Sequence, residues 1–190
     1  IIVKNYEEIG FLQRHAYTGT VMADHDLYTY SNRTQEAFAQ SGICRNTVPL
    51  ELNYKELRHR DCSNSELLIY GYLPLMVSAG CIFKSLRKCQ KKESLCCLKD
   101  RYGKFFPVKN NCMECYNTIY NTTPLMLFGY GKELQKADFS NFRLNFTVES
   151  EEEVRQILAI YETVFYEGRK NLADVYQGEY TNGHYKRGVE

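Results

Sequence analysis

Short apolar runs alternate with helical patterns over the first 80 residues, and this alternation limits the possible folds more strongly than any other feature. The expected elements are strands at 1–3, 20–23, 48–53 and 67–73 and helices at 6–14 and 33–40. Strand–helix–strand repeats predict a parallel sheet with right-handed crossovers. The predicted fold class is therefore α/β, and the loops after the strand carboxyl ends are the expected place for functional residues.

Cysteines are concentrated in the middle of the chain, where the region from Cys81 to Cys115 holds six of the eight. Between residues 84 and 109, nine Lys or Arg residues accompany two Asp or Glu residues, a local net charge of +7 against −6 for the rest. The net charge of the whole chain, +1, excludes a protein whose entire surface attracts polyanions, but it is compatible with a local basic patch.

A four-cysteine metal site is the sharpest chemical hypothesis. The segment Cys112-Met-Glu-Cys115 has C-x-x-C spacing, and Cys81 and Cys89 supply a second pair. Four thiolates can hold zinc or an iron–sulfur cluster, and clustering of this kind favours a reducing cytoplasm. Two alternatives stay open, which are disulfides in a secreted chain with glycosylation triplets such as Asn32-Arg-Thr, and ordinary reduced cysteines.

The remaining cysteines have other expected roles. Cys96 and Cys97 form an alternative partner pair, although adjacent side chains rarely serve one metal ion well. Cys44 and Cys62 lie far along the chain from the cluster, and we expect them to be buried small hydrophobic residues.

Polar residues at the expected strand ends form a second set of candidates. Asp24, His25 and Asp26 follow one strand, and His25 between two carboxylates suits a general base or a metal ligand. Glu51 and Asn53 share one face of the expected strand at 48–53 and suit a pair lining a substrate. A hydrogen-bonded loop histidine and a polar rim explain these residues equally well. The chain has no Gly-rich phosphate loop, no G-x-S-x-G and no H-E-x-x-H.

Basic residues beside the cysteines are interleaved with Phe83, Tyr102, Phe105 and Phe106. This combination is a candidate nucleic-acid surface, with a solvated charged face as the simpler interpretation. The basic patch is Lys84, Arg87, Lys88, Lys91 and Lys92.

The last third of the chain has one secure local pattern. Ser150 and Glu153 form a capping box, an apolar stripe from Val154 to Phe165 follows, and Gly168 closes the expected helix. A half-buried strand at 142–148 precedes it, and we expect the tail to be a loose extension. One of the two longest uncharged stretches, residues 67–83, is too short for a membrane helix, which needs about 20 apolar residues.

Three longer segments carry a family resemblance. Residues 66–81, 98–108 and 112–121 resemble the later part of members of the peptidase U32 family, the collagenase-like proteases, and so do the shorter pieces at 23–28, 49–53 and 183–190. The family commonly has a His-Gly-x-x-Cys run where this chain reads Tyr70-Gly-Tyr-Leu-Pro74. A common cysteine is thus replaced by Pro74, and the C-x-x-C would supply the substitute.

The resemblance implies the later βα units of a TIM-type (β/α)8 barrel, with an amino-terminal half missing. By this division residues 1–80 are a partial barrel, 81–121 a Cys-rich basic insertion, 122–170 a closing strand and helix, and 171–190 a C-terminal extension. Open strand edges then predict that the fragment self-associates.

The resemblance also implies an enzyme. Relatives hydroxylate RNA bases or quinone precursors and carry a four-cysteine cluster, so the expected cofactor is a 4Fe-4S cluster or Zn on Cys81, Cys89, Cys112 and Cys115. The expected partner is RNA or a peptide substrate in the cytoplasm, with no membrane. The alternatives are a collagenase-like peptidase in which Asp24, His25 and Glu51 activate water, and a zinc-stapled scaffold without catalysis.

Overall fold

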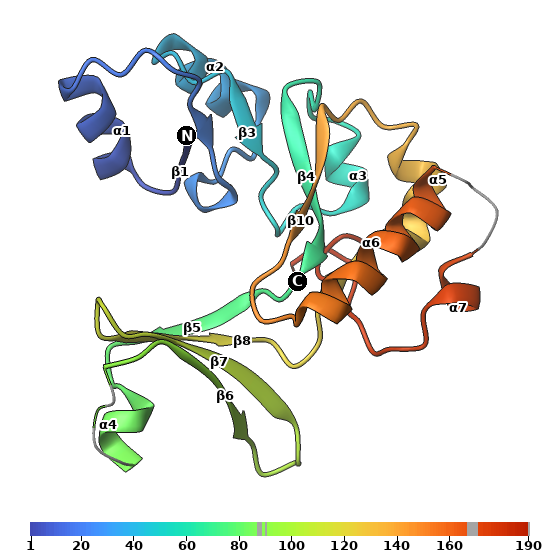
Figure 1. The fold of residues 1–190 in the computed structure, drawn as a ribbon. Coiled ribbons are helices and arrows are strands. Elements are labelled where there is room, and N and C mark those ends of the chain that lie inside the picture. Colours follow the sequence, from blue (N-terminus) through green and yellow to red (C-terminus); the bar gives the residue numbers. More distant parts are fainter. Residues whose placement is uncertain (87–88, 90, 167–170, 190) are drawn as a thin grey trace. The chain divides into compact units, whose positions relative to one another are not determined.

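The computed structural model describes residues 1–86, 89, 91–166 and 171–189, and the chain forms two compact units (Figure 1). We call them unit 1 and unit 2. Unit 1 comprises Ile1–Ile69, Leu127–Leu144 and Asn182–Glu190, and unit 2 comprises Tyr70–Met126 and Asn145–Thr181. Each unit is therefore assembled from segments that are far apart in the sequence.

The first sheet confirms the predicted α/β class. Its first four strands pair in parallel, and the strand order is β1-β2-β3-β4-β10. The strands are β1 (Ile2–Val3), β2 (Met22–Ala23), β3 (Arg45–Thr47), β4 (Ser65–Gly71) and β10 (Asn141–Asn145). A short strand, β9 (Leu125–Met126), pairs antiparallel with the end of β4.

Two capped helices lie beside these strands in unit 1 (Figure 1). The Asn5 side chain accepts from the Glu8 amide at the start of α1 (Tyr6–Arg14), and Ser31 does the same for α2 (Asn32–Gln40). Gly42, with a φ of 83°, follows the end of α2 and allows the chain to leave the helix. The buried core between helices and strands is Val3, Ile9, Ala23, Leu27, Phe38 and Ile43.

The predicted strand at 48–53 is wrong. The strand is β3, which ends at Thr47, and the following residues form a loop and turn before α3 (Tyr54–Leu57). Pro49 has no amide proton to donate to a neighbouring strand, which explains why the ladder stops here. The other short helices of unit 1 are η1 (His25–Leu27), η2 (Phe128–Tyr130) and α5 (Gly131–Leu134).

Unit 2 contains an antiparallel sheet with the order β5-β8-β7-β6. Its strands are β5 (Pro74–Ser78), β6 (Ser94–Lys99), β7 (Phe105–Asn111) and β8 (Tyr116–Tyr120). A turn through Tyr102 and Gly103 joins β6 to β7, and Gly103 has a φ of 83°. The helix α4 (Ile82–Leu86) follows β5.

Helix α6 (Glu151–Phe165) confirms the most secure local prediction. Ser150 and Glu153 form the expected capping box, and Ile157 and Phe165 are buried. The predicted terminator, Gly168, lies outside the described residues. The last helix of unit 2 is α7 (Leu172–Val175). None of the described helices combines the length and the apolar character needed to cross a membrane.

The tail is not a loose extension. In unit 2, Thr181 donates its amide to the Pro124 carbonyl and accepts from the Met126 amide, both at 2.9 Å. In unit 1, Tyr185 is 5% exposed, and its ring packs against those of Tyr54 and Tyr130. Backbone pairing and aromatic burial therefore hold this segment in place.

Candidate functional site

The four predicted cysteine ligands lie in unit 2, near one end of its sheet. Cys112 and Cys115 belong to the turn that joins β7 to β8, and Cys81 follows β5. The last residue of β5, Ser78, pairs with Asn117 of β8, so the register places the Cys81 segment beside the C-x-x-C turn. Cys89 is exposed and lies beyond α4.

A buried asparagine fastens the two cysteine-bearing segments to each other. Asn117 is 0% exposed and donates Nδ2 to the Gly80 carbonyl at 2.8 Å. Cys115 has a φ of 59°, and its thiol donates to the Cys112 carbonyl over 3.7 Å. The left-handed backbone at Cys115 thus closes a tight turn, as C-x-x-C metal sites require.

The Cys112 thiol lies close enough to the other three cysteines for their charges to affect its pKa. Desolvation raises the pKa of Cys112 above its ordinary value, and the charges of Cys89, Cys115 and Cys81 raise it further. Thiolates that repel one another in this way would be stabilised by a shared cation.

The sulfur atoms are still spread more widely than ligands around a single ion. Among the described residues, no three cysteines have all their sulfur atoms within 4.8 Å of one another. Metal binding would therefore require side-chain rotations that draw the thiolates together. The four thiols and the tight turn fit a four-thiolate centre, but the sulfur atoms lie farther apart than they would around a bound metal ion.

The other cysteines differ from one another in exposure. All eight cysteines are free. Cys62 is buried as predicted, but Cys44 is exposed, so the expectation of burial is wrong for that residue. Cys96 and Cys97 are neighbours in β6 and point to opposite faces of the sheet, which agrees with their poor suitability as a pair for one metal ion.

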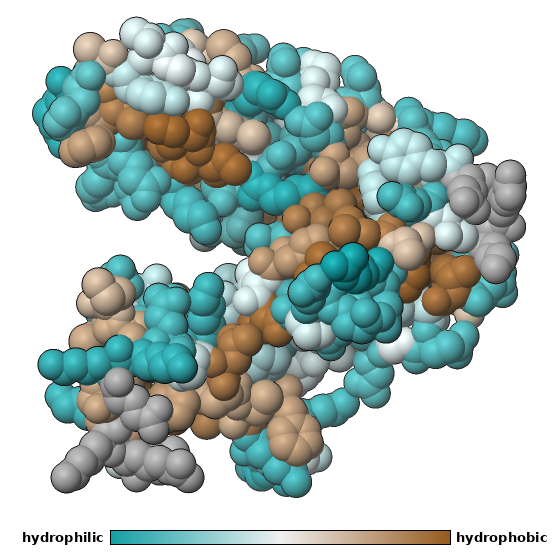
Figure 2. Space-filling model, in the orientation of Figure 1, coloured by the Kyte–Doolittle hydropathy of each residue, from teal (hydrophilic) through white to brown (hydrophobic). Residues whose placement is uncertain are grey.

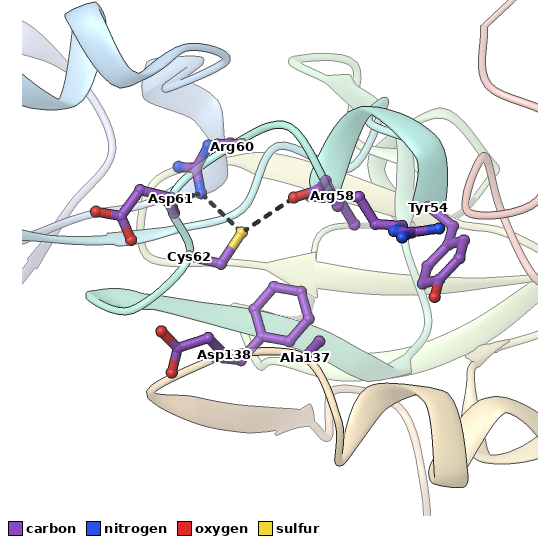
Figure 3. Close-up of a pocket in the computed structure, with 9 residues that line it drawn as sticks. Tyr54, Arg58, Arg60, Asp61, Cys62, Ala137 and Asp138 are labelled. Atoms are coloured by element: carbon purple, nitrogen blue, oxygen red, sulfur yellow. Dashed lines mark hydrogen bonds between the residues drawn. The ribbon is translucent and has the colours of Figure 1, made fainter.

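Cys62 lines a cavity of about 270 Å³ in unit 1 (Figure 3). Its sulfur accepts from Arg60 Nη1 at 3.5 Å and donates to the Leu57 carbonyl at 3.8 Å. Burial raises the pKa of Cys62, although Arg60 works in the opposite direction. This arrangement favours a neutral, unreactive thiol.

The second predicted group, Asp24, His25 and Asp26, follows β2 in unit 1. Among the described residues it is the one set of at least three potential ligand side chains whose ligand atoms all lie within 4.8 Å of one another. His25 Nδ1 is 3.1 Å from Asp26 Oδ1. These residues form the tight turn η1, with Asp24 as its N-cap.

Asp24 is held by an arginine that sequence reasoning did not single out. Arg143 Nη1 donates to Asp24 Oδ1 at 2.9 Å, and Nη2 contacts both Glu66 Oε1 and Thr47 Oγ1. Burial alone raises the pKa of Asp24, but Arg143 and His25 outweigh it and hold the pKa below its ordinary value. Asp24 is therefore an ionised partner of Arg143 and a poor general base.

Asp24, Thr47, Glu66 and Arg143, which we call the polar row, lie on one face of the first sheet. Val3, Ala23 and Asn46 are register partners, and Thr47 pairs with Glu66 in the next row. Because side chains alternate along a strand, the row of Thr47 and Glu66 points away from the apolar core. One feature of the sequence does point to this ion pair. Glu66 is a charged residue at the start of a strand that is otherwise uncharged, and a buried charge of this kind needs a partner of opposite charge.

Glu51 and Asn53 do not form a pair on a strand. Asn53 caps α3, because its side chain accepts from the amides of Lys55 and Glu56. Burial raises the pKa of Tyr30, and the charge of Glu51 and a hydrogen bond to it add to this effect. The Asn53 side chain therefore has a structural role, and Glu51 interacts with Tyr30.

The basic patch is only partly described. Lys84, Lys91 and Lys92 are exposed, and Arg87 and Lys88 lie outside the described residues. Farther along the same segment, two cations lie over aromatic rings: Lys99 Nζ is 5.2 Å from the Phe105 centroid, and the Arg101 guanidinium is 4.7 Å from that of Tyr102.

Comparisons of the chain with protein-family models, with curated proteins and with solved structures find no match.

Proposed function

We propose that the chain is the later part of a U32-type enzyme in which four cysteines bind a zinc ion or a 4Fe-4S cluster. The ligands are Cys81, Cys89, Cys112 and Cys115. The observation that carries the proposal is that the register of β5 and β8 and the hydrogen bond from Asn117 to Gly80 hold the Cys81 segment beside the C-x-x-C turn.

The residues around the centre suit a set of thiolates. A bound zinc ion would supply a structural cross-link, and a bound cluster would supply an electron carrier. Asn117 holds the Cys81 segment against the C-x-x-C turn, so two parts of the ligand set are positioned by the protein alone. Lys84, Lys91 and Lys92 come from the same segment of the chain and would offset the negative charge of the thiolates.

Unit 1 supports the barrel part of the proposal. Its four parallel strands pack helices against a core on one face, while the opposite face carries the row of Asp24, Thr47, Glu66 and Arg143. In a TIM-type barrel the face away from the helices is the interior. We assign the polar row to the interior of such a barrel.

The substrate we propose is RNA, or a small molecule that is hydroxylated. The pairs Lys99–Phe105 and Arg101–Tyr102 place cations over aromatic rings on the basic segment. Rings of this kind stack on bases, and the neighbouring cations contact phosphates. Charge reversal at Lys91 and Lys92 should abolish RNA binding, whereas reversal at the exposed residues Lys55 and Lys132 of unit 1 should leave it unchanged.

Anaerobic purification with metal and sulfide analysis tests the centre. The wild-type chain and the control Cys44→Ser should contain stoichiometric zinc, or iron and sulfide with visible absorption, and Cys112→Ser should lose most of it. A metal-free chain that keeps its fold after all its cysteines are alkylated would contradict the proposal. Zinc without any catalytic activity would identify the scaffold alternative.

A peptidase is the second candidate, because Asp24, His25 and Asp26 bring three ligand side chains together in unit 1. The ion pair between Arg143 and Asp24 leaves His25 and Asp26 as the groups able to activate water. Peptide cleavage that survives Cys112→Ser but not His25→Ala would favour this candidate over the first.

A further inference from the structure

Two tyrosine rings of unit 1 lie on the surface, in the segment that follows β2. Tyr28 is 53% exposed and Tyr30 is 42% exposed. Their rings are nearly parallel, with 13° between the ring planes and 5.7 Å between the centroids. In a parallel sheet, the loops after the strand carboxyl ends are the usual place for a ligand. Tyr28 and Tyr30, which we call the tyrosine pair, therefore form an exposed aromatic platform where a ligand is expected.

The residue between the two tyrosines anchors the platform. Thr29 is 0% exposed, and its carbonyl accepts from Arg60 Nε at 3.0 Å. Its hydroxyl accepts from Arg60 Nη2 and donates to Asn46 Oδ1, both at 3.2 Å. Arg60 and Asn46 are themselves buried. The two rings are therefore carried by a backbone that is fixed to the interior, and little ordering would be needed when a ligand binds.

The backbone of Tyr28 adopts an unfavourable conformation. Its φ and ψ are both 52°, in the left-handed region that residues other than glycine rarely occupy. The Tyr28 carbonyl accepts from the Tyr30 amide at 2.8 Å, so this turn also sets the direction of the second tyrosine. Backbone strain of this kind is concentrated at ligand-binding and active sites, where the surrounding structure maintains it.

A carboxylate lies next to the tyrosine pair. Burial raises the pKa of Tyr30, and the charge of Glu51 and a hydrogen bond to it raise that pKa further. Among the described residues, Glu51 forms no ion pair with a lysine, arginine or histidine. In the same part of the chain, no lysine or arginine lies over either ring of the pair. The platform is thus aromatic and negatively charged, and a positive charge is its complement.

A cation that carries methyl groups fits this platform better than one that carries N–H groups. The Tyr30 hydroxyl already forms a hydrogen bond with Glu51, so a ligand would meet ring surface and negative charge. Tyrosine faces attract quaternary ammonium groups through the quadrupole of the ring. The methyl groups of such a cation also cover apolar ring surface, which an unsubstituted ammonium group does less well.

We propose that the tyrosine pair and Glu51 bind a trimethylammonium group, with its methyl groups against the two rings and its charge near the Glu51 carboxylate. The group can belong to a free molecule of the choline type or to the side chain of a trimethylated lysine. The site lies in unit 1, and the inference depends neither on the four-cysteine centre nor on the basic segment.

An NMR titration of the full chain, with labelled tyrosine rings, tests the site. The first probe is choline, and two matched compounds separate its properties. Dimethylbutanol has a tert-butyl group in place of the trimethylammonium group and no charge, and ethanolamine has the charge but no methyl groups. We expect choline to shift the ring signals of Tyr28 and Tyr30 saturably, and to bind at least about threefold more tightly than either compound.

A fourth probe distinguishes the two sources of the trimethylammonium group. This probe is N-acetyl-trimethyl-lysine methylamide. Tighter binding of this probe than of choline assigns the site to modified lysine side chains, and the reverse order assigns it to free molecules.

Two variants with matched controls locate the binding. Glu51→Gln keeps an acceptor for Tyr30 but removes the charge, and it should weaken choline binding by about threefold or more. Glu36→Gln, at an exposed position of α2, should leave the affinity unchanged. Tyr28→Leu should also weaken binding by about threefold, whereas Tyr17→Leu, at a ring that is 43% exposed, should not. Equal affinities for choline and dimethylbutanol, binding of ethanolamine as tight as that of choline, no saturable shift, or unchanged binding in Glu51→Gln would overturn the proposal.

Discussion

Arg143 contacts two acidic side chains, Asp24 and Glu66, that are themselves almost fully buried. Arg143→Met would leave Glu66 without its cation and Asp24 with only the exposed Lys4, and we expect the free energy of unfolding to fall by about 3 kcal/mol. Arg155→Met is the control, because Arg155 pairs with Glu151 on an exposed helix surface and should cost less than about 0.5 kcal/mol. Urea unfolding measures both, and equal losses would show that the row does not stabilise unit 1.

Asp24 should also make stability depend on pH. The pKa of Asp24 in the folded state lies below the ordinary value for an aspartate. The ionised carboxylate therefore stabilises the fold fully when the pH is above the ordinary pKa, and this stabilisation is lost as the pH falls through the folded-state pKa. Between about pH 6 and about pH 3, Asp24→Asn should therefore lose less unfolding free energy than the wild type. Asp138→Asn, at an exposed position of unit 1, should follow the wild-type curve. Parallel curves for wild type and Asp24→Asn would contradict the assignment.

Single residues show where sequence reasoning about the site reaches its limit. The C-x-x-C pattern made Cys112 and Cys115 candidate ligands from the sequence alone, because the two residues are only three positions apart. Arg143 could not be paired with Asp24 in this way, since the two are 119 residues apart and only the sheet order brings them together. Asn53 was misassigned because a capping asparagine and a ligand-binding asparagine look the same without knowledge of the helix that follows.

At the scale of the element, helix α6 depends on its first turn. Ser150 accepts from the Glu153 amide, and Glu153 accepts from the Ser150 amide and hydroxyl, which lowers the pKa of Glu153. Ser150→Ala should reduce the free energy of unfolding by about 1 kcal/mol. Ser85→Ala, in an exposed position of the short helix α4, is the control and should change it by less than about 0.5 kcal/mol. A loss below that level in Ser150→Ala would contradict the role of the cap.

Elements with a repeated signal were predictable, and those decided by one residue were not. Helices α1 and α6 combine an apolar stripe with a cap, so two independent signals agree. At 48–53 the alternation favoured a strand, but Pro49 ends the ladder and Asn53 starts α3. The tail was expected to be loose because Tyr185 carries no local pattern, yet its burial depends on the distant rings of Tyr54 and Tyr130.

At the scale of the whole molecule, open strand edges predict self-association. β5 lies at one edge of its sheet and exposes Leu75, Met76 and Val77 by 56 to 65%. Hydrophobic residues reach the surface over this sheet in Figure 2. Light scattering should show mass increasing with concentration, and Val77→Lys should reduce the increase because a charge on an edge strand opposes pairing.

A matched variant separates edge pairing from general stickiness. Tyr166→Lys removes an apolar residue that is 77% exposed but lies at the end of α6, so it should leave the self-association unchanged. A monomer at every concentration would refute the prediction. An equal effect of the two variants would show that strand pairing is not responsible.

The charged row of unit 1 also bears on how the chain is made. Asp24 and Glu66 are translated 119 and 77 residues before Arg143, which pairs with both of them. A nascent chain that has not yet reached Arg143 would have to bury Glu66 without a cation and Asp24 with only the exposed Lys4, which is unfavourable. Unit 1 should therefore mature late in synthesis, and its first strands are the part of the chain for which a ribosome-associated chaperone would be most useful.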